Sequence, residues 1–243
     1  MRPRTLVAVF AHGDDETGVA PLLARCAREG ARVHLILVTD GAEGTAHTSI
    51  ARGPDLARER EAEARCAALA LGIRPPVFLG FPDGALGHFN ADPGLLHRLT
   101  ERLHRELRRL RADALVTYGP EGATGHPDHR LVSSVLTQLV RAGAHGVTAR
   151  LFYAGLPLAV FRAFGRRRRA GPAALVAETR HFTLRVRFAP EDLAAARRAM
   201  ECHRTQFSAA TVERLHHALA AAWKGRLPLA PALFPFSGSD LFG

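Results

Sequence analysis

Short apolar runs alternate with segments of helical periodicity over the first 155 residues of the chain. The apolar runs predict β-strands over residues 6–11, 33–38, 77–79, 114–118 and 150–154. Apolar positions that recur every three or four residues predict helices over residues 15–29, 54–71, 94–111 and 127–141. This alternation is typical of a doubly wound, mainly parallel sheet, and we therefore predict a Rossmann-like α/β fold.

The last third of the chain follows a different pattern. Residues 181–188 alternate between apolar and polar side chains, which predicts a strand that extends the sheet or forms a small β addition. Helices are predicted over residues 191–203 and 211–223, whereas the proline-rich tail from Leu227 gives no clear pattern. We predict a single domain over residues 1–243, with a Rossmann-like core (1–155) and a C-terminal α+β elaboration (156–243).

Two polar clusters follow predicted strands. Residues 11–16 read Ala-His-Gly-Asp-Asp-Glu after the first strand, and residues 125–129 read Gly-His-Pro-Asp-His after the fourth. In an open α/β sheet the ligand crevice lies at the carboxyl ends of the strands, where the strand order reverses. For the order 3-2-1-4-5 that point falls between strands 1 and 4, so we expect the clusters to face each other. Helix capping would account for either cluster alone, but not for both at one edge.

Together the clusters offer the residue types of a catalytic zinc site. Such a site uses three protein ligands of the His/Asp type and leaves a fourth position for water. The remaining imidazole and carboxylate groups would carry protons during catalysis.

The chain resembles the LmbE-like, or PIG-L, zinc-dependent deacetylases. The family pattern Ala-His-Pro-Asp-Asp-Glu is present at residues 11–16 with Gly13 in place of proline, and Gly-His-Pro-Asp-His is complete at residues 125–129. Thr124 stands where some members carry a tyrosine. Weaker matches are Arg60 to Glu63 ahead of Leu71-Gly72, Pro82-Asp83, and His203 to Gln206.

The resemblance implies that His12, Asp15 and His129 bind one divalent ion per chain, which we expect to be zinc. The same ligand set also suits iron or cobalt, because two imidazoles and a carboxylate do not select a single metal.

The resemblance also implies roles for the other residues of these motifs. Asp14 would act as general base, and His126 would stabilise the oxyanion and protonate the leaving amine. Asp128 would orient His126 and favour its charged form. Arg60 and Asp83 would bind polar groups of the substrate.

The implied activity is hydrolytic removal of an N-acetyl or other N-acyl group from an amino sugar or a GlcNAc-containing conjugate by metal-activated water. One alternative is a zinc amidase acting on a thiol-sugar conjugate or an acylated natural product. Another is a catalytically silent ligand-binding module on the same fold. A nucleotide-binding domain is disfavoured because no G-x-G-x-x-G pattern follows the first strand.

Charge and composition change this interpretation little. The net charge is +10, but Lys224 is the only lysine and the arginines accompany a high alanine content. The dense run Arg166 to Arg169 is interpreted as a solvated loop, and without interleaved aromatic residues we expect no nucleic-acid partner.

The remaining expectations concern location and partners. No apolar run reaches the roughly 18–20 residues of a membrane span, and the N-terminal apolar run lacks a cleavage pattern, so we predict a cytoplasmic protein without membrane contact. The expected partner is a small N-acetylated sugar-type substrate, and a homo-oligomer is compatible with the sequence. Cys26 and Cys66 are expected to be buried apolar residues.

Overall fold

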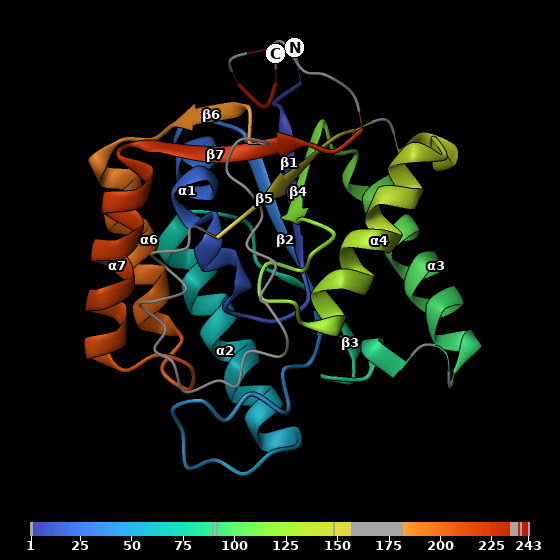
Figure 1. Ribbon diagram of the computed structural model, residues 1–243, viewed down its shortest axis with the longest axis horizontal. Coiled ribbons are helices and arrows are strands. Elements are labelled where there is room, and N and C mark those ends of the chain that lie inside the picture. The colour runs from blue at the N-terminus through green and yellow to red at the C-terminus, as the bar shows by residue number, and fades with distance from the viewer. Residues whose placement is uncertain are drawn as a thin grey trace.

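A seven-stranded sheet forms the centre of the structure, a computed structural model that describes residues 2–88, 90, 92–147, 149–156, 182–233, 238 and 240–242. The strand order is β3-β2-β1-β4-β5-β7-β6 (Figure 1). The strands are β1 (Thr5–Phe10), β2 (Arg32–Thr39), β3 (Val77–Phe81), β4 (Ala114–Tyr118), β5 (Arg150–Ala154), β6 (Leu184–Arg187) and β7 (Arg226–Pro231). Strands β1 to β5 pair in parallel, and β7 pairs antiparallel with β5 and β6. The predicted order of the first five strands is confirmed.

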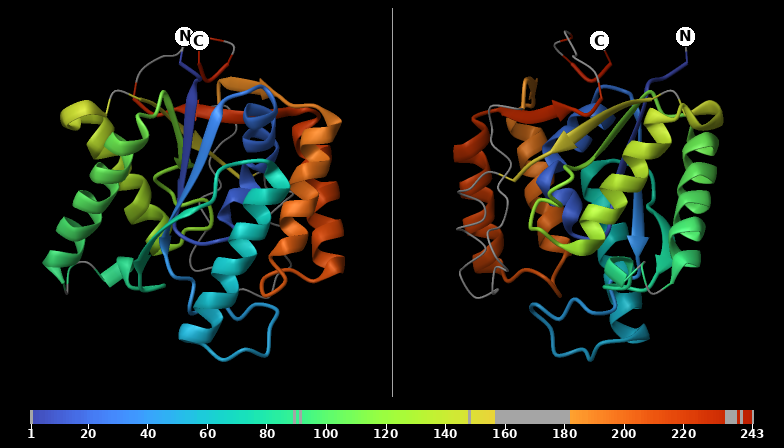
Figure 2. Two further views of the ribbon diagram at one scale, coloured as in Figure 1. Left: turned by 180° about the vertical axis from the view of Figure 1, so that it is seen from behind. Right: turned by 45° about the vertical axis from the view of Figure 1, so that its right-hand side comes forward.

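Helices cover both faces of this sheet, as Figures 1 and 2 show. On one face lie α3 (Pro93–Leu110) and α4 (Pro127–Arg141), together with the short 3-10 helices η2 (Leu86–His88) and η3 (Ala144–Gly146). On the other lie α1 (Ala20–Arg28), α2 (Pro54–Leu71) and α6 (Pro190–Cys202), with η1 (Asp15–Gly18) ahead of α1. Helix α7 (Ala209–Trp223) packs against α6 and β7. The predicted Rossmann-like α/β fold is confirmed.

The apolar runs are buried because side chains of successive strand residues point to opposite faces, and both faces are covered. In β1, Leu6, Ala8 and Phe10 join the core beneath α1, α2 and α6. Val7 and Val9 join the core beneath α3 and α4. Strand β1 therefore has no solvent-facing side, and its carboxyl end is fixed by packing on both faces.

The structure corrects two sequence expectations for secondary structure. The helix predicted over residues 15–29 is divided into η1 and α1, with Pro21, which cannot donate a backbone hydrogen bond, in the first turn of α1. Strand β7 was not predicted, because Pro228 and Pro231 are residues that strands usually exclude. Each proline fits because Pro228 pairs only with β6 and Pro231 only with β5.

Two of the three cysteines form a disulfide. Cys66 of α2 is bonded to Cys202 at the end of α6, so the prediction of Cys66 as a buried apolar residue is wrong. Cys26 is free and buried, as predicted.

Three further expectations concern membrane spans, the arginine run and the domain organisation. Within that part of the chain, no helix is both long and apolar enough to cross a membrane. The arginine run at residues 166–169 lies outside the described residues. The single-domain organisation stays a prediction.

Candidate active site

The two polar clusters meet at the carboxyl edge of the sheet. His12 lies two residues after the end of β1, and η1 places Asp15 three residues further on. Strand β4 lies beside β1 and leads into α4, whose first turn carries His129. His126 is the N-cap of α4, where its Nδ1 accepts a hydrogen bond of 3.2 Å from the backbone N–H of Asp128. The sequence forms this turn readily because Pro127, the first residue of the helix, needs no hydrogen-bond acceptor.

His12, Asp15 and His129 converge on one point. His12 Nδ1 lies 3.0 Å from His129 Nε2. Asp15 Oδ1 is 3.2 Å from His129 Nε2, and Asp15 Oδ2 is 3.6 Å from His12 Nδ1. Ligand atoms held tetrahedrally at about 2.1 Å from a zinc ion lie roughly 3.4 Å apart. The three side chains therefore have the spacing of a metal-ligand triad.

The protons of the two imidazoles support the same interpretation. His129 Nδ1 lies 2.9 Å from the carbonyl oxygen of Gly122, which can only accept, so Nδ1 carries the proton and Nε2 a lone pair. His12 Nε2 lies 2.9 Å from Asp83 Oδ1 and 3.4 Å from Asp128 Oδ2, and these two carboxylates favour a proton on Nε2. When both rings are neutral, the lone pairs of His12 Nδ1 and His129 Nε2 face each other, an arrangement that a shared cation would stabilise.

The charges around these groups also favour a cation. Burial lowers the pKa of His12, but the carboxylates of Asp128, Asp15 and Asp83 outweigh burial and raise it well above its ordinary value. Burial raises the pKa of Asp15, but His129 and His12 outweigh it and hold this pKa below its ordinary range. Positive charge is therefore stabilised at the meeting point of these groups.

Two other groups of residues that share His12 could also hold an ion. Ligand atoms of His12, His126 and His129 lie within 4.8 Å of one another, as do those of His12, Asp83 and Asp128. The identity of the metal is not fixed by this geometry, and the ligand set of His12, Asp15 and His129 stays a prediction.

Asp83 and Asp128 occupy positions that differ from the sequence expectation. Asp83 Oδ1 is directed at His12, while Oδ2 accepts a 3.2 Å hydrogen bond from the backbone N–H of Glu43. The contacts of Asp83 indicate that it orients His12, and its role in substrate binding stays a prediction.

The Asp128 carboxylate accepts from the backbone N–H groups of Gly84 and Gly87, at 2.8 and 3.2 Å. The hydrogen bond between Asp128 and His126 comes from the Asp128 backbone and not from its carboxylate, and the orienting role of Asp128 stays a prediction. Burial and the neighbouring His12 and His129 lower the pKa of His126, and the charge of Asp128 acts in the opposite direction, as expected, without outweighing them.

Arg60 is buried beside the predicted base and does not project from α2 into solvent. Its Nη2 donates to Asp14 Oδ1 and to the carbonyl oxygen of Gly13, both at 3.0 Å. Its Nη1 donates to the carbonyl oxygen of Gly41 at 3.0 Å. A Cβ at Gly44 would clash with the Arg60 guanidinium, so a side chain there would displace it. Burial raises the pKa of Asp14, and the charge of Arg60 opposes that shift.

These contacts change the expected effect of removing Arg60. Arg60→Ala should lower the free energy of unfolding by about 2–3 kcal/mol, less than for a fully enclosed pair because the Asp14 side chain is 25% exposed. It should also lower kcat more than it raises KM, because Asp14 loses its fixed orientation. Chemical unfolding and steady-state kinetics test this, with Arg58→Ala on the exposed face of α2 as control. A change in KM alone would instead support substrate binding by Arg60.

Several residues at the site were not assigned a role from the sequence. Tyr118, at the end of β4, donates a 2.7 Å hydrogen bond to the backbone oxygen of Asp15 and stacks on the His129 ring. Glu16 is fully buried and lies 2.5 Å from His203 Nε2. The sequence signal for Tyr118 was its position at the end of a strand, next to the point where the strand order reverses. Glu16 and His203 lie in motifs that were recognised but were given no function of their own.

Gly13 is the position where the family pattern has proline. A Cβ built on Gly13 would meet the nearest side-chain atoms, from Ala64 and Leu37, at 3.4 Å, which is ordinary van der Waals contact. The site therefore has room for a side chain at this position, and glycine is not required by space.

The sheet is Rossmann-like, and imidazoles and carboxylates cluster at its switch point, where the strand order reverses. These features define the chain as an α/β protein with a candidate metal-binding active site. The chain belongs to the PIG-L family, since the family model described as GlcNAc-PI de-N-acetylase matches residues 7–140.

Relatives of this chain are named deacetylases. A 1D-myo-inositol 2-acetamido-2-deoxy-alpha-D-glucopyranoside deacetylase of Corynebacterium urealyticum is 32% identical over 84% of this chain and 71% of its own length. The enzyme of the same name from Rhodococcus opacus is 34% identical over 65% of this chain, which spans 59% of that relative.

The fold is similar to that of N,N'-diacetylchitobiose deacetylase from Pyrococcus horikoshii. The TM-score is 0.70 with 17% identity, and the match covers 96% of this chain and 88% of the other. At this level of identity the similarity supports the fold alone.

Proposed function

We propose that this protein is a metal-dependent N-deacetylase that releases acetate from an amino sugar or a GlcNAc-containing conjugate. The proposal rests on two imidazole nitrogens, His12 Nδ1 and His129 Nε2, which lie 3.0 Å apart beside the Asp15 carboxylate. The names of the relatives support the reaction and the substrate class.

His12, Asp15 and His129 would hold the ion. A divalent cation at this position supplies Lewis acidity, which polarises an amide carbonyl and makes an attacking water more acidic. Asp83 keeps the His12 ring in the tautomer that this requires, and Gly122 does so for His129. Zinc is the expected metal, and iron and cobalt fit the same residue types.

Asp14 takes a proton from the attacking water. Its side chain is 25% exposed, whereas those of Asp15, Asp83 and Asp128 are 9%, 7% and 0% exposed, so it is the carboxylate of the cluster most open to solvent. Arg60 fixes Asp14 Oδ1 through a 3.0 Å hydrogen bond. A carboxylate held in one orientation is suited to act as general base.

His126 stabilises the oxyanion and delivers a proton to the leaving nitrogen. Because its Nδ1 accepts the capping hydrogen bond, the proton of the neutral ring is on Nε2. The lowered pKa of His126, caused by burial and two neighbouring imidazoles, keeps the ring neutral near neutral pH. Nε2–H is then a hydrogen-bond donor for the oxyanion. When His126 Nε2 gives its proton to the leaving nitrogen, the proton that Asp14 took from the water passes to His126 and returns the ring to its neutral form.

A released-amine assay tests the proposed reaction. Protein loaded with zinc, iron(II) or cobalt(II) is incubated with N-acetylglucosaminyl glycosides, including an inositol glycoside, and with acetylated peptides and aliphatic amides of similar size. We expect amine and acetate in equal amounts from the sugars, and loss of activity with a chelator.

The comparison between substrate sets separates the alternatives. Equal turnover of aliphatic amides would reject the sugar assignment while retaining an amidase. Binding of the sugars without any amine release under all three metals would support a silent ligand-binding module.

A further inference from the structure

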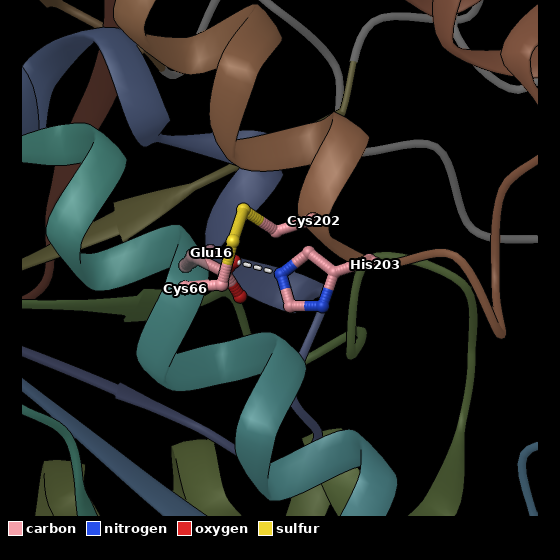
Figure 3. The surroundings of a disulfide bond; sticks show 4 residues. All are labelled: Glu16, Cys66, Cys202 and His203. Atoms are coloured by element: carbon pink, nitrogen blue, oxygen red, sulfur yellow. Dashed lines mark hydrogen bonds and ion pairs between the residues drawn. A yellow bond between two sulfur atoms is a disulfide. The ribbon is translucent and has the colours of Figure 1, made fainter.

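The disulfide between Cys66 and Cys202 lies beside the contact between Glu16 and His203 (Figure 3). Cys66 is exposed and Cys202 is half-buried. The bond joins α2 to the last residue of α6, and the two cysteines are 136 positions apart in the sequence. Because Cys66 is exposed, a small thiol can reach its sulfur atom.

The residues that follow Cys202, residues 203–206, form what we call the tether segment. His203 Nε2 lies 2.5 Å from Glu16 Oε1, and both side chains are fully buried. Thr205 donates to the Glu63 carboxylate from its backbone N–H and from its hydroxyl, both at 2.7 Å. Glu63 lies one turn before Cys66 on α2. The disulfide and these hydrogen bonds therefore hold the same contact between α2 and the end of α6 with its tether segment.

The tether segment also holds the loop at residues 40–53. Gln206 Nε2 donates to the carbonyl oxygen of Gly44 at 2.5 Å, and the His47 N–H donates to the Thr205 carbonyl oxygen at 2.7 Å. The backbone of Gly44, like that of Gly41, lies against Arg60. At its other end the segment reaches Glu16, which directly follows Asp15. Movement of residues 203–206 would therefore disturb both the η1 turn and the surroundings of Arg60.

We propose that Cys66–Cys202 is a thiol-exchange site through which a low-molecular-weight thiol loosens the tether segment and lowers activity. The activity part rests on the proposed deacetylase function. A thiolate attacks the exposed Cys66 sulfur, a mixed disulfide forms, and Cys202 leaves as a thiolate. A second thiol then attacks the mixed disulfide and releases Cys66. The protein disulfide gains two electrons, two protons are taken up by the cysteines, and two small thiols become one small disulfide.

Loss of this bond should act through local opening. A cross-link between distant residues restricts the open states of the chain, so its removal favours them. Residues 203–206 immediately follow the bonded Cys202 and would open first. Cys26 provides an internal reference, because it is buried and burial raises the pKa of its thiol to about 12, so it should not react in the folded protein.

Thiol counting and hydrogen exchange test the proposal without any activity measurement. Protein purified without reductant and then denatured should contain one thiol per chain, and protein reduced with a small monothiol and then denatured should contain three. The intact mass should also show the mixed disulfide at intermediate ratios of thiol to disulfide. In the folded state, amide exchange at residues 203–206 and 42–47 should be on the order of tenfold faster after reduction.

Activity provides the functional part of the test. Reduction should lower kcat/KM severalfold. A Cys66→Ser/Cys202→Ser double variant should have the kcat/KM of the reduced protein, and added thiol should not change it. Cys26→Ala should respond to thiol as the wild type does. Equal exchange in the two redox states, unchanged turnover on reduction of an active enzyme, or three thiols in unreduced protein would overturn the proposal. If neither form releases amine, the proposed function fails, and thiol counts and exchange still decide whether the site exists.

Discussion

Replacing His129 with alanine is expected to remove most of the bound divalent ion and to lower kcat/KM by about 10³-fold or more. The variant leaves His12 and Asp15 as the predicted ligands, and two protein ligands hold zinc poorly. Loss of Lewis acidity removes several kcal/mol of transition-state stabilisation, and about 4 kcal/mol corresponds to a factor of 10³ in rate. Elemental analysis of the purified variant and steady-state kinetics measure the two effects.

The matched control is His217→Ala, which removes an imidazole from the exposed surface of α7. It should retain full metal content and wild-type turnover. Added zinc should raise the melting temperature of metal-free wild-type protein, because an ion that binds only the folded state stabilises it, but not that of His129→Ala. Full metal occupancy in His129→Ala would show that the ligand assignment is wrong.

Asp14→Asn is expected to keep the metal and the fold but to reduce kcat by roughly 10²–10⁴-fold, the usual contribution of a positioned general base. Asparagine has nearly the same shape, and its side-chain oxygen can still accept the hydrogen bond from Arg60 Nη2 that Asp14 Oδ1 accepts at 3.0 Å. The variant therefore removes the proton acceptor while leaving the contact with α2 in place. Metal content, thermal unfolding and kcat are compared with the wild type.

Asp55→Asn, which removes an exposed carboxylate from the first turn of α2, serves as the control for this change. It should leave kcat and metal content unchanged. Wild-type turnover in Asp14→Asn would exclude the base role, and loss of the metal would place Asp14 among the ligands.

The predicted arrangement of the core and of the two clusters follows from local sequence patterns. The apolar runs indicate strands buried on both faces, and the structure places Val7 and Leu6 in opposite cores of the same sheet. Pro127 indicates a helix start, and the structure begins α4 there. Once alternating strands and helices predict a doubly wound sheet, the switch point follows from the strand order, and with it the meeting of His12 with His129.

The partners of the polar side chains could not be predicted in the same way. Arg60 lies in a charged helical segment that is typical of a solvated surface, yet it is buried against Asp14 and Gly13. Asp83 and Asp128 each occupy a motif position, but both carboxylates lie against His12. Which group a carboxylate contacts depends on the path of two loops and on rotamers selected by packing, and neither leaves a periodic signal in the sequence.

Contacts between residues far apart in the sequence are also set by the tertiary structure. Cys66 and Cys202 are 136 positions apart, and only the packing of α2 against α6 brings their Cα atoms to 5.7 Å. Strand β7 can contain two prolines because only one neighbouring strand pairs with each of them. The sequence by itself determined which apolar runs form the core and which residue types stand where the strand order reverses, because hydrophobic periodicity and helix-start signals are local properties of the chain. The tertiary structure decided which side chains touch, because that depends on contacts between segments far apart in the chain.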